Sequence, residues 1–203
     1  MLQLYGNPRS RAMRCLWMLE EVGQPYQLVD KSLRADDLHS ADYLKLNPNA
    51  RIPTLVDGSV VLWESMAINL YLAQKYPGPM HCTEAAVLGH AAQWSFWAVL
   101  EIEMLLLHML EHRVLLAEHA RDISVVERCE LLLRRPLGIL NGALAGRSHL
   151  AGDGFTVADL NVASILSWAR PARIDLGAVP KMADWFKRCS DRPAARAARD
   201  LQR

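Results

Sequence analysis

The sequence predicts an α/β domain followed by an all-helical domain, and three observations lead to this fold class. Residues 2–30 read as strand, helix and strand, and a hairpin of two short strands follows at residues 52–62. The β signals then end at a Tyr-Pro-Gly-Pro cluster. Beyond this cluster, apolar residues recur at helical spacing. We therefore expect one domain at residues 1–77, a linker at 78–86 and a helical domain at 87–203.

The bulk properties of the chain are those of an ordinary globular protein. Its 203 residues are 51% hydrophobic and 22% charged, and the formal net charge of +1 gives no sign of a nucleic-acid or anionic-membrane partner. The N-terminus has no signal-peptide pattern, and no apolar run approaches the roughly 18 residues of a membrane span. We therefore expect a cytoplasmic protein. The four cysteines have no metal-binding spacing, which predicts reduced thiols and no metal site.

The first strand, helix and strand have clear local signals. Residues 2–5 alternate like a short strand, and Gly-Asn-Pro-Arg supplies a turn before a helical pattern that starts at Ser10. Gly23 and a nearby proline mark the helix end, and residues 26–29 form a plausible second strand. A strand, helix and strand in so short a segment predict a parallel pair with a right-handed crossover.

The stretch from residue 47 to residue 72 joins a proline-bearing strand to an acidic helix start. Residues 52–56 read as an apolar strand with Pro53 near its start, where a proline is tolerated at an edge, a strand start or a bulge. A cis bond is the rarer alternative. Asp-Gly then predicts a hairpin turn, and Glu64 with Ser65 opens an amphipathic helix.

A helix start beside such a strand is suited to an acidic, peptide-like ligand. Unpaired N–H groups and the positive end of the helix dipole favour a carboxylate at Ser65. The extended backbone around Ile52 can pair with the ligand, and Glu64 can take its amine. The alternative is a plain hairpin followed by a helix with an acidic first turn.

Ser10 is the residue to which we assign chemistry, although its position also suits a structural role. Serine is a preferred residue at a helix start, where its hydroxyl caps a backbone N–H. The functional alternative is that the hydroxyl donates to a ligand thiol and stabilises its thiolate. Spacing alone leaves both roles open.

The runs NPNARIPTLVDG and ESMAINLYL resemble the glutathione-binding half of the cytosolic glutathione transferases. The resemblance implies a thioredoxin-like domain followed by a helical bundle, with a cis-proline and a Glu-Ser pair holding the tripeptide glutathione. It also implies that basic residues help to bind a glutathione carboxylate. The implied glutathione-binding residues are Ile52, Pro53, Glu64, Ser65, Arg51 and Arg34.

The spacing Ser10-x-x-x-Arg14 is similar to the catalytic serine motif of theta- and delta-like members of this family. Bacterial beta-like members carry a cysteine at the corresponding place. The serine here argues against a mixed-disulfide mechanism based on that position. Over the whole chain, the resemblance implies a bacterial, theta/beta-like enzyme with Ser10 as its catalytic residue. We interpret Arg14 as structural.

The resemblance implies a homodimeric detoxification enzyme that joins glutathione, as co-substrate, to an apolar electrophile. The residues that we expect to line the second-substrate pocket are Asn7, Trp97, Met104 and Trp168. Two alternatives stay open: glutathione-dependent reduction of a disulfide or peroxide or an isomerisation, and a non-catalytic scaffold of the same fold.

The second half of the chain has its strongest folding signal at Thr156. Residues 84–118 predict one long helix or two kinked ones, and a second helix at 123–144 contains Pro136, which should bend or interrupt it. Thr156 and Asp159 predict a capping box for the next helix. A last helix precedes a polar tail rich in alanine and arginine.

Overall fold

The computed structural model describes residues 1–32 and 35–202. The chain divides into two compact units, of which the first contains residues 1–82 and 192–203. The second contains residues 83–191. The last twelve residues therefore return to the unit in which the chain began.

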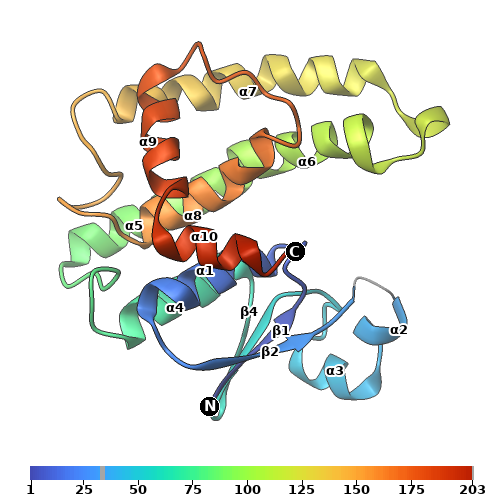
Figure 1. The fold of residues 1–203 in the computed structure, drawn as a ribbon, viewed down its shortest axis with the longest axis vertical. Helices are drawn as coiled ribbons and strands as arrows, with labels where there is room; N and C mark the ends of the chain where they lie inside the picture. The colour runs from blue at the N-terminus through green and yellow to red at the C-terminus, as the bar shows by residue number, and fades with distance from the viewer. Residues whose placement is uncertain (33–34, 203) are drawn as a thin grey trace. The chain divides into compact units, whose positions relative to one another are not determined.

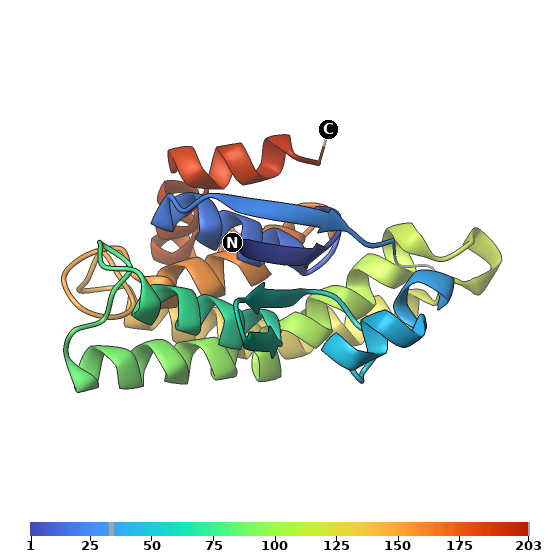
Figure 2. The same cartoon turned by 90° about the horizontal axis from the view of Figure 1, so that it is seen from below.

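The first unit is built on a four-stranded sheet in the order β2-β1-β3-β4 (Figures 1 and 2). β1 pairs in parallel with β2, whereas β3 is antiparallel to both β1 and β4. The strands are β1 (Leu2–Gly6), β2 (Tyr26–Asp30), β3 (Thr54–Asp57) and β4 (Val60–Trp63). The predicted parallel pair and the predicted hairpin are both confirmed, as is the thioredoxin-like first domain.

Two helices of this unit pack against each other beside the sheet (Figure 1). They are α1 (Ala12–Val22) and α4 (Ser65–Lys75). α1 ends as predicted at Gly23, whose φ of 64° is left-handed and whose N–H donates to the carbonyl of Leu19. Between β2 and β3 lie the short helices α2 (Ala35–Leu38) and α3 (Ala41–Leu46).

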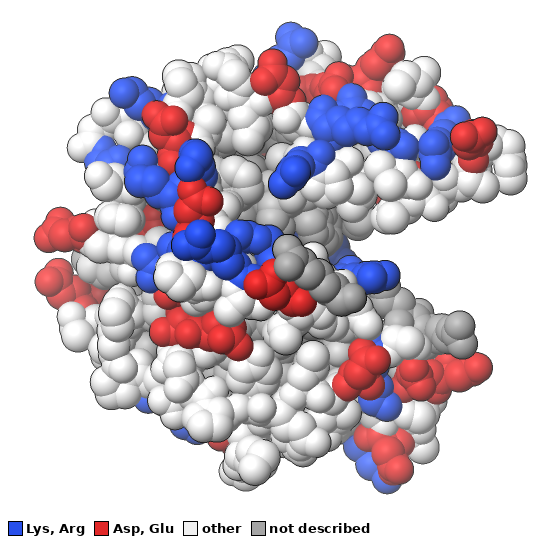
Figure 3. Space-filling view, in the orientation of Figure 1, with Lys and Arg blue, Asp and Glu red and all other residues white. Residues whose placement is uncertain are grey.

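The expectation of a polar tail after the last predicted helix is wrong, because these residues form α10 (Pro193–Asp200). Pro193 suits the first turn of a helix, where its missing N–H costs nothing. Ala195 and Ala198, three residues apart, are buried, and α10 packs along α1. The opposite side of α10 is basic, and Lys and Arg side chains gather over this helix in Figure 3.

The second unit is helical, which confirms the predicted class of this part of the chain. The long helical stretch predicted after residue 84 is divided by π and 3-10 segments, whereas the helix that contains Pro136 continues through it. The elements up to that helix are α5 (Ala85–Ala98), η1 (Val99–Glu103), α6 (Met104–Leu110), η2 (Glu111–Leu115), η3 (Glu118–Ala120) and α7 (Ile123–Ala143). Those after it are α8 (Val157–Leu166), η4 (Ser167–Ala169) and α9 (Pro180–Ser190). None of the helices in the described residues is long and apolar enough to cross a membrane.

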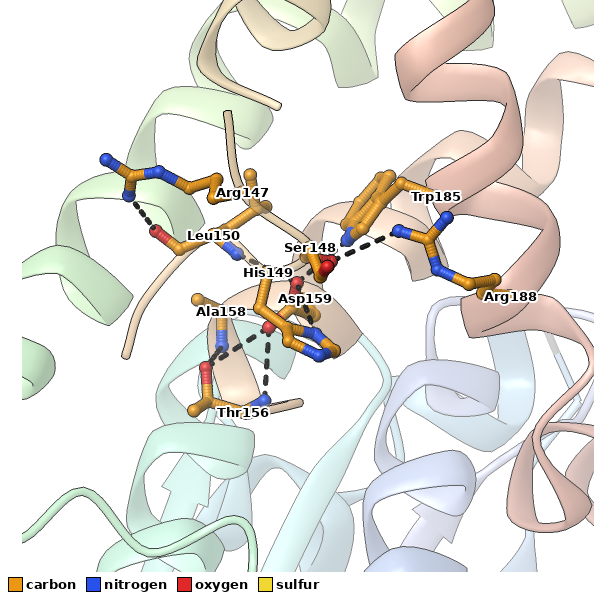
Figure 4. A network of polar contacts seen from close by, with 9 residues as sticks. All are labelled: Arg147, Ser148, His149, Leu150, Thr156, Ala158, Asp159, Trp185 and Arg188. Atoms are coloured by element: carbon orange, nitrogen blue, oxygen red, sulfur yellow. Dashed lines mark hydrogen bonds and ion pairs between the residues drawn. The ribbon is translucent and has the colours of Figure 1, made fainter. Parts of the chain in front are cut away.

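α8 begins with the predicted capping box, and its acidic member is also the centre of a wider network (Figure 4). The Asp159 carboxylate accepts from the Thr156 N–H at 3.1 Å, the Leu150 N–H at 3.0 Å and the Trp185 indole N–H at 2.8 Å. Its side chain is fully buried. The start of α8 is thereby tied to the preceding loop and to α9.

Candidate functional site

Three segments of the first unit meet where the two central strands of the sheet, β1 and β3, have their end and start. Because β1 and β3 are antiparallel, with Tyr5 opposite Thr54, the end of β1 lies beside the residues that precede β3. A Cβ atom on Gly6 would lie 3.9 Å from the Cβ of Ile52 and only 2.5 Å from that of Ala12. The turn that carries Ser10 therefore begins close to the strand that carries the expected ligand-binding backbone.

The start of α4 is connected to the same end of the central strands by hydrogen bonds to α1. Arg14 Nη1 donates to the Ser65 hydroxyl at 3.4 Å, and the Asn69 amide donates to the Arg14 carbonyl at 3.3 Å. Arg14 lies one helical turn beyond Ser10. The residue that we interpreted as structural thus contacts an expected ligand-binding residue.

The Ser10 hydroxyl has two hydrogen bonds in this structure. It donates to the Asn7 carbonyl at 2.7 Å and accepts from the Ala12 N–H at 3.1 Å. The second bond is a local side-chain-to-backbone bond at the start of α1. Ser10 lies one residue before the N-cap, which is Arg11 and has no side-chain capping bond. Since a hydroxyl has one hydrogen and two lone pairs, Ser10 can turn its hydrogen toward a ligand and still accept from Ala12.

The turn before Ser10 is fixed by its own side chains. Asn7 donates through its amide nitrogen to the Asp30 carboxylate at 3.1 Å and accepts from the Arg9 N–H at 2.9 Å. Asn7, expected in the second-substrate pocket, is therefore engaged in holding the turn. The contribution of Asp30 was missed, because nothing in its local sequence indicates a partner 23 positions away.

The peptide bond between Ile52 and Pro53 is cis, as the resemblance implied. In the described residues, the backbone N–H and C=O of Ile52 have no hydrogen-bond partner. Ile52 itself is nearly buried, at 8% exposure. Its side chain is therefore held in the protein while its backbone polar groups stay available to a ligand.

Buried polar side chains fix the backbone on either side of this bond. The Arg51 carbonyl accepts from the Tyr43 hydroxyl at 2.6 Å and from the Asn47 amide at 2.8 Å. The same two groups lie 3.0 and 3.1 Å from the Thr54 hydroxyl. Burial raises the pKa of Tyr43, which keeps its hydroxyl protonated as a donor. No pattern in the sequence indicates this network, since polar residues in a turn are usually solvated.

Glu64 has an unusual backbone conformation at the start of α4. Its φ of 72° and ψ of 113° lie where residues other than glycine rarely occur, and its side chain is exposed. Strain of this kind often occurs at ligand-binding sites. Ser65, which follows, is buried at 5% exposure and begins the helix. The first-turn N–H groups of α4 are the free donors that a carboxylate requires.

Five further residues were predicted for the site: Arg51, Arg34, Trp97, Met104 and Trp168. The Arg51 side chain is exposed, and Arg34 lies outside the described residues. Three of the predicted pocket residues belong to the helical unit. Trp97 is half-buried, and its ring meets that of Trp94 edge-on with 5.0 Å between the ring centres. Met104 is 45% exposed, and Trp168 is half-buried. Their role in a second-substrate pocket stays a prediction.

Cys15 is close to Ser10 in the sequence, but its thiol is not reactive. It is fully buried, and burial raises its pKa far above that of an ordinary thiol. A cysteine in this state is an inert, protonated side chain. Among the described residues, no group of three or more His, Cys, Asp or Glu side chains is placed to hold a metal ion.

Comparisons with known proteins identify the family of this chain. Residues 1–74 match the family model for the glutathione S-transferase N-terminal domain, and residues 101–193 match the model for the C-terminal domain. Glutathione S-transferase 3 of Zea mays is 37% identical over 95% of this chain and 90% of its own length. The disulfide-bond oxidoreductase YfcG of Escherichia coli strain K12 is 30% identical, with coverage of 96% and 92%. The solved theta class glutathione S-transferase from Xanthomonas axonopodis pv. citri, with glutathione bound, has a TM-score of 0.90 at 26% identity, covering 97% of this chain and 96% of that one. This chain belongs to the glutathione S-transferase family.

Proposed function

We propose that the protein is a glutathione S-transferase in which Ser10 stabilises the glutathione thiolate for attack on an apolar electrophile. The observation that carries the proposal is that three features meet at the same end of the central strands β1 and β3. These are the available backbone of Ile52, the start of α4 at Ser65 and the turn that carries Ser10. Related proteins that bind glutathione share the fold over nearly the whole chain.

In this proposal the glutathione backbone pairs with the polar groups of Ile52. One carboxylate lies at the first-turn N–H groups of α4, with the Ser65 hydroxyl as a further donor. Glu64, which is exposed, accepts from the glutathione amine. Arg51, whose side chain is also exposed, and Arg34 supply positive charge for the second carboxylate.

The chemical step belongs to the bound sulfur. The Ser10 hydrogen turns from the Asn7 carbonyl to the thiolate, while its oxygen keeps the bond from the Ala12 N–H. This donor lowers the pKa of the glutathione thiol and so raises its thiolate fraction at neutral pH. The thiolate then forms a carbon–sulfur bond with the electrophile as the leaving group departs with its electron pair. Ser10 forms no covalent bond.

The class, assembly and setting of the enzyme are also part of the proposal. The enzyme is a bacterial, theta/beta-like transferase with serine at position 10, and it acts in cytoplasmic detoxification. The sequence supports domains at residues 1–77 and 87–203 with a linker at 78–86, although the segment that follows α9 belongs to the first compact unit. Phe96 and Leu100, four residues apart, are 62% and 78% exposed, which favours a homodimer that covers them.

The test is to replace Ser10 with alanine. We expect Ser10→Ala to raise the pKa of the bound glutathione thiol and to lower kcat/KM with an aryl halide by about a hundredfold, while glutathione still binds. The thiol pKa is measured by ultraviolet absorbance of the thiolate. Equal rates and an equal thiol pKa would refute the role of Ser10. Turnover of a disulfide or a hydroperoxide that exceeds turnover of the aryl halide would refute the transferase assignment.

A further inference from the structure

The C-terminal segment contacts α1 and the turn before it at two separate points. This segment runs from Arg192 through α10 to Gln202 and belongs to the first compact unit. Ala195 and Ala198 pack against α1 between these two points. Figure 2 shows α10 on the β2 side of the sheet, along the helix that Ser10 precedes.

The beginning of the segment is anchored at the far end of α1. Arg192 donates to both carboxylate oxygens of Glu21, at 2.6 and 2.8 Å. The Glu21 side chain is only 7% exposed and also accepts from the Trp17 indole N–H at 2.9 Å. A two-point arginine–carboxylate pair of this kind fixes both position and orientation. The start of α10 therefore has a defined place along α1.

The end of the segment reaches the turn that carries Ser10. The Gln202 side-chain amide donates to the Pro8 carbonyl at 2.8 Å, and Arg9 donates in return to the Gln202 carbonyl at 3.4 Å. The Pro8 carbonyl is in the Pro8–Arg9 peptide unit. The preceding peptide unit contains the Asn7 carbonyl, which accepts from the Ser10 hydroxyl. Gln202 is thus separated from the Ser10 hydroxyl by a single short turn of backbone.

We propose that Gln202 is a positioning residue that holds the Pro8–Arg9 peptide and so sets the direction of the Ser10 hydroxyl. The inference rests on the proposed role of Ser10 and adds a part of the site that lies almost two hundred positions away in the chain. Asn7 fixes one side of the turn through Asp30, and Gln202 fixes the other. A donor held from both sides loses less freedom when it turns to the thiolate.

Gln202→Met tests this directly, because methionine keeps the length of the side chain and removes its N–H donor. We expect a roughly threefold to tenfold lower kcat/KM with an aryl halide, and a higher pKa of the bound glutathione thiol. The thermal midpoint should not change, since the bond is at the surface. The matched control is Arg196→Ala on the exposed side of α10, the helix that precedes Gln202, which should leave both readouts unchanged.

A double-mutant cycle separates this inference from the proposed function. If Gln202 acts through Ser10, Gln202→Met should have little further effect on the thiol pKa in a Ser10→Ala background. Full additivity in the cycle, or a Gln202→Met enzyme with unchanged thiol pKa, would overturn the role of Gln202 alone. A Ser10→Ala enzyme with an unchanged thiol pKa would instead overturn the proposed function.

Discussion

Asp159 should be far more important to stability than a surface capping residue. A serine, threonine or aspartate cap at an exposed helix start contributes about 1 kcal/mol. Asp159 is fully buried and accepts from the N–H groups of Leu150, Thr156 and Trp185 (Figure 4). Its replacement therefore strands donors in three different parts of the helical unit.

The expected magnitude follows from those three donors. Each buried N–H that loses its partner costs about 1–3 kcal/mol, and water entering the space left by the carboxylate offsets part of this sum. We therefore expect Asp159→Ala to lower the free energy of unfolding by about 3–5 kcal/mol. Asp159→Asn should also be strongly destabilising, because its amide places a new donor among three existing donors.

Urea unfolding followed by circular dichroism measures this loss. The control is Asp122→Ala at the start of α7, where the carboxylate is exposed and accepts from the N–H and the hydroxyl of Ser124. We expect the control to be much less destabilised than Asp159→Ala. If the two variants lose the same stability, Asp159 is an ordinary cap and the reasoning about stranded donors is wrong.

Two further predictions concern the first unit. Gly6→Ala places a Cβ 2.5 Å from that of Ala12, so α1 must shift. We expect the free energy of unfolding to fall by about 1–3 kcal/mol and the rate of conjugation to fall as well, as measured by a urea titration and a rate assay. The control is Gly146→Ala, where a Cβ meets no atom within 4 Å. A hydrogen bond from Lys75 holds the pKa of Asp57 below its usual value, so Asp57 stabilises the fold above its unfolded-state pKa of about 4 and ceases to do so as pH falls through its folded-state pKa. The stability gap between the parent and Asp57→Asn should therefore shrink as the pH is lowered, and a gap that stays constant would contradict this.

The parts of the fold that the sequence predicts are those with strong local signals. The Asp57-Gly58 turn joins β3 to β4, and Gly58 has the positive φ of 61° that such a turn favours. Gly23 ends α1 in the same conformation. Ser65 begins α4, and the box of Thr156 begins α8. Each of these depends on residues within a few positions of one another.

The parts that could not be predicted depend on partners that are distant in sequence. Tyr43 and Asn47 hold the carbonyl of Arg51, but no periodicity marks a side chain that binds backbone. α10 was missed because Ala195 and Ala198 are too small to give an apolar stripe. Alanine buries little surface, so its contribution here depends on how closely α1 approaches, which only the packed structure reveals.

The proposed glutathione site depends more on the path of the backbone than on the identity of most side chains. Such a site can be kept in relatives whose side chains mostly differ. The proposed ligand contacts at Ile52 and at the start of α4 use backbone groups, which any sequence supplies as long as the backbone follows the same path. The residues that must be kept are those that determine the backbone path. They are Gly6, the buried side chains that bind the Arg51 carbonyl, and the turn before Ser10. A relative at 26% identity that binds glutathione and keeps a TM-score of 0.90 fits this reasoning. Substrate preference should then vary mainly with the side chains of the helical unit, where no such backbone constraint applies.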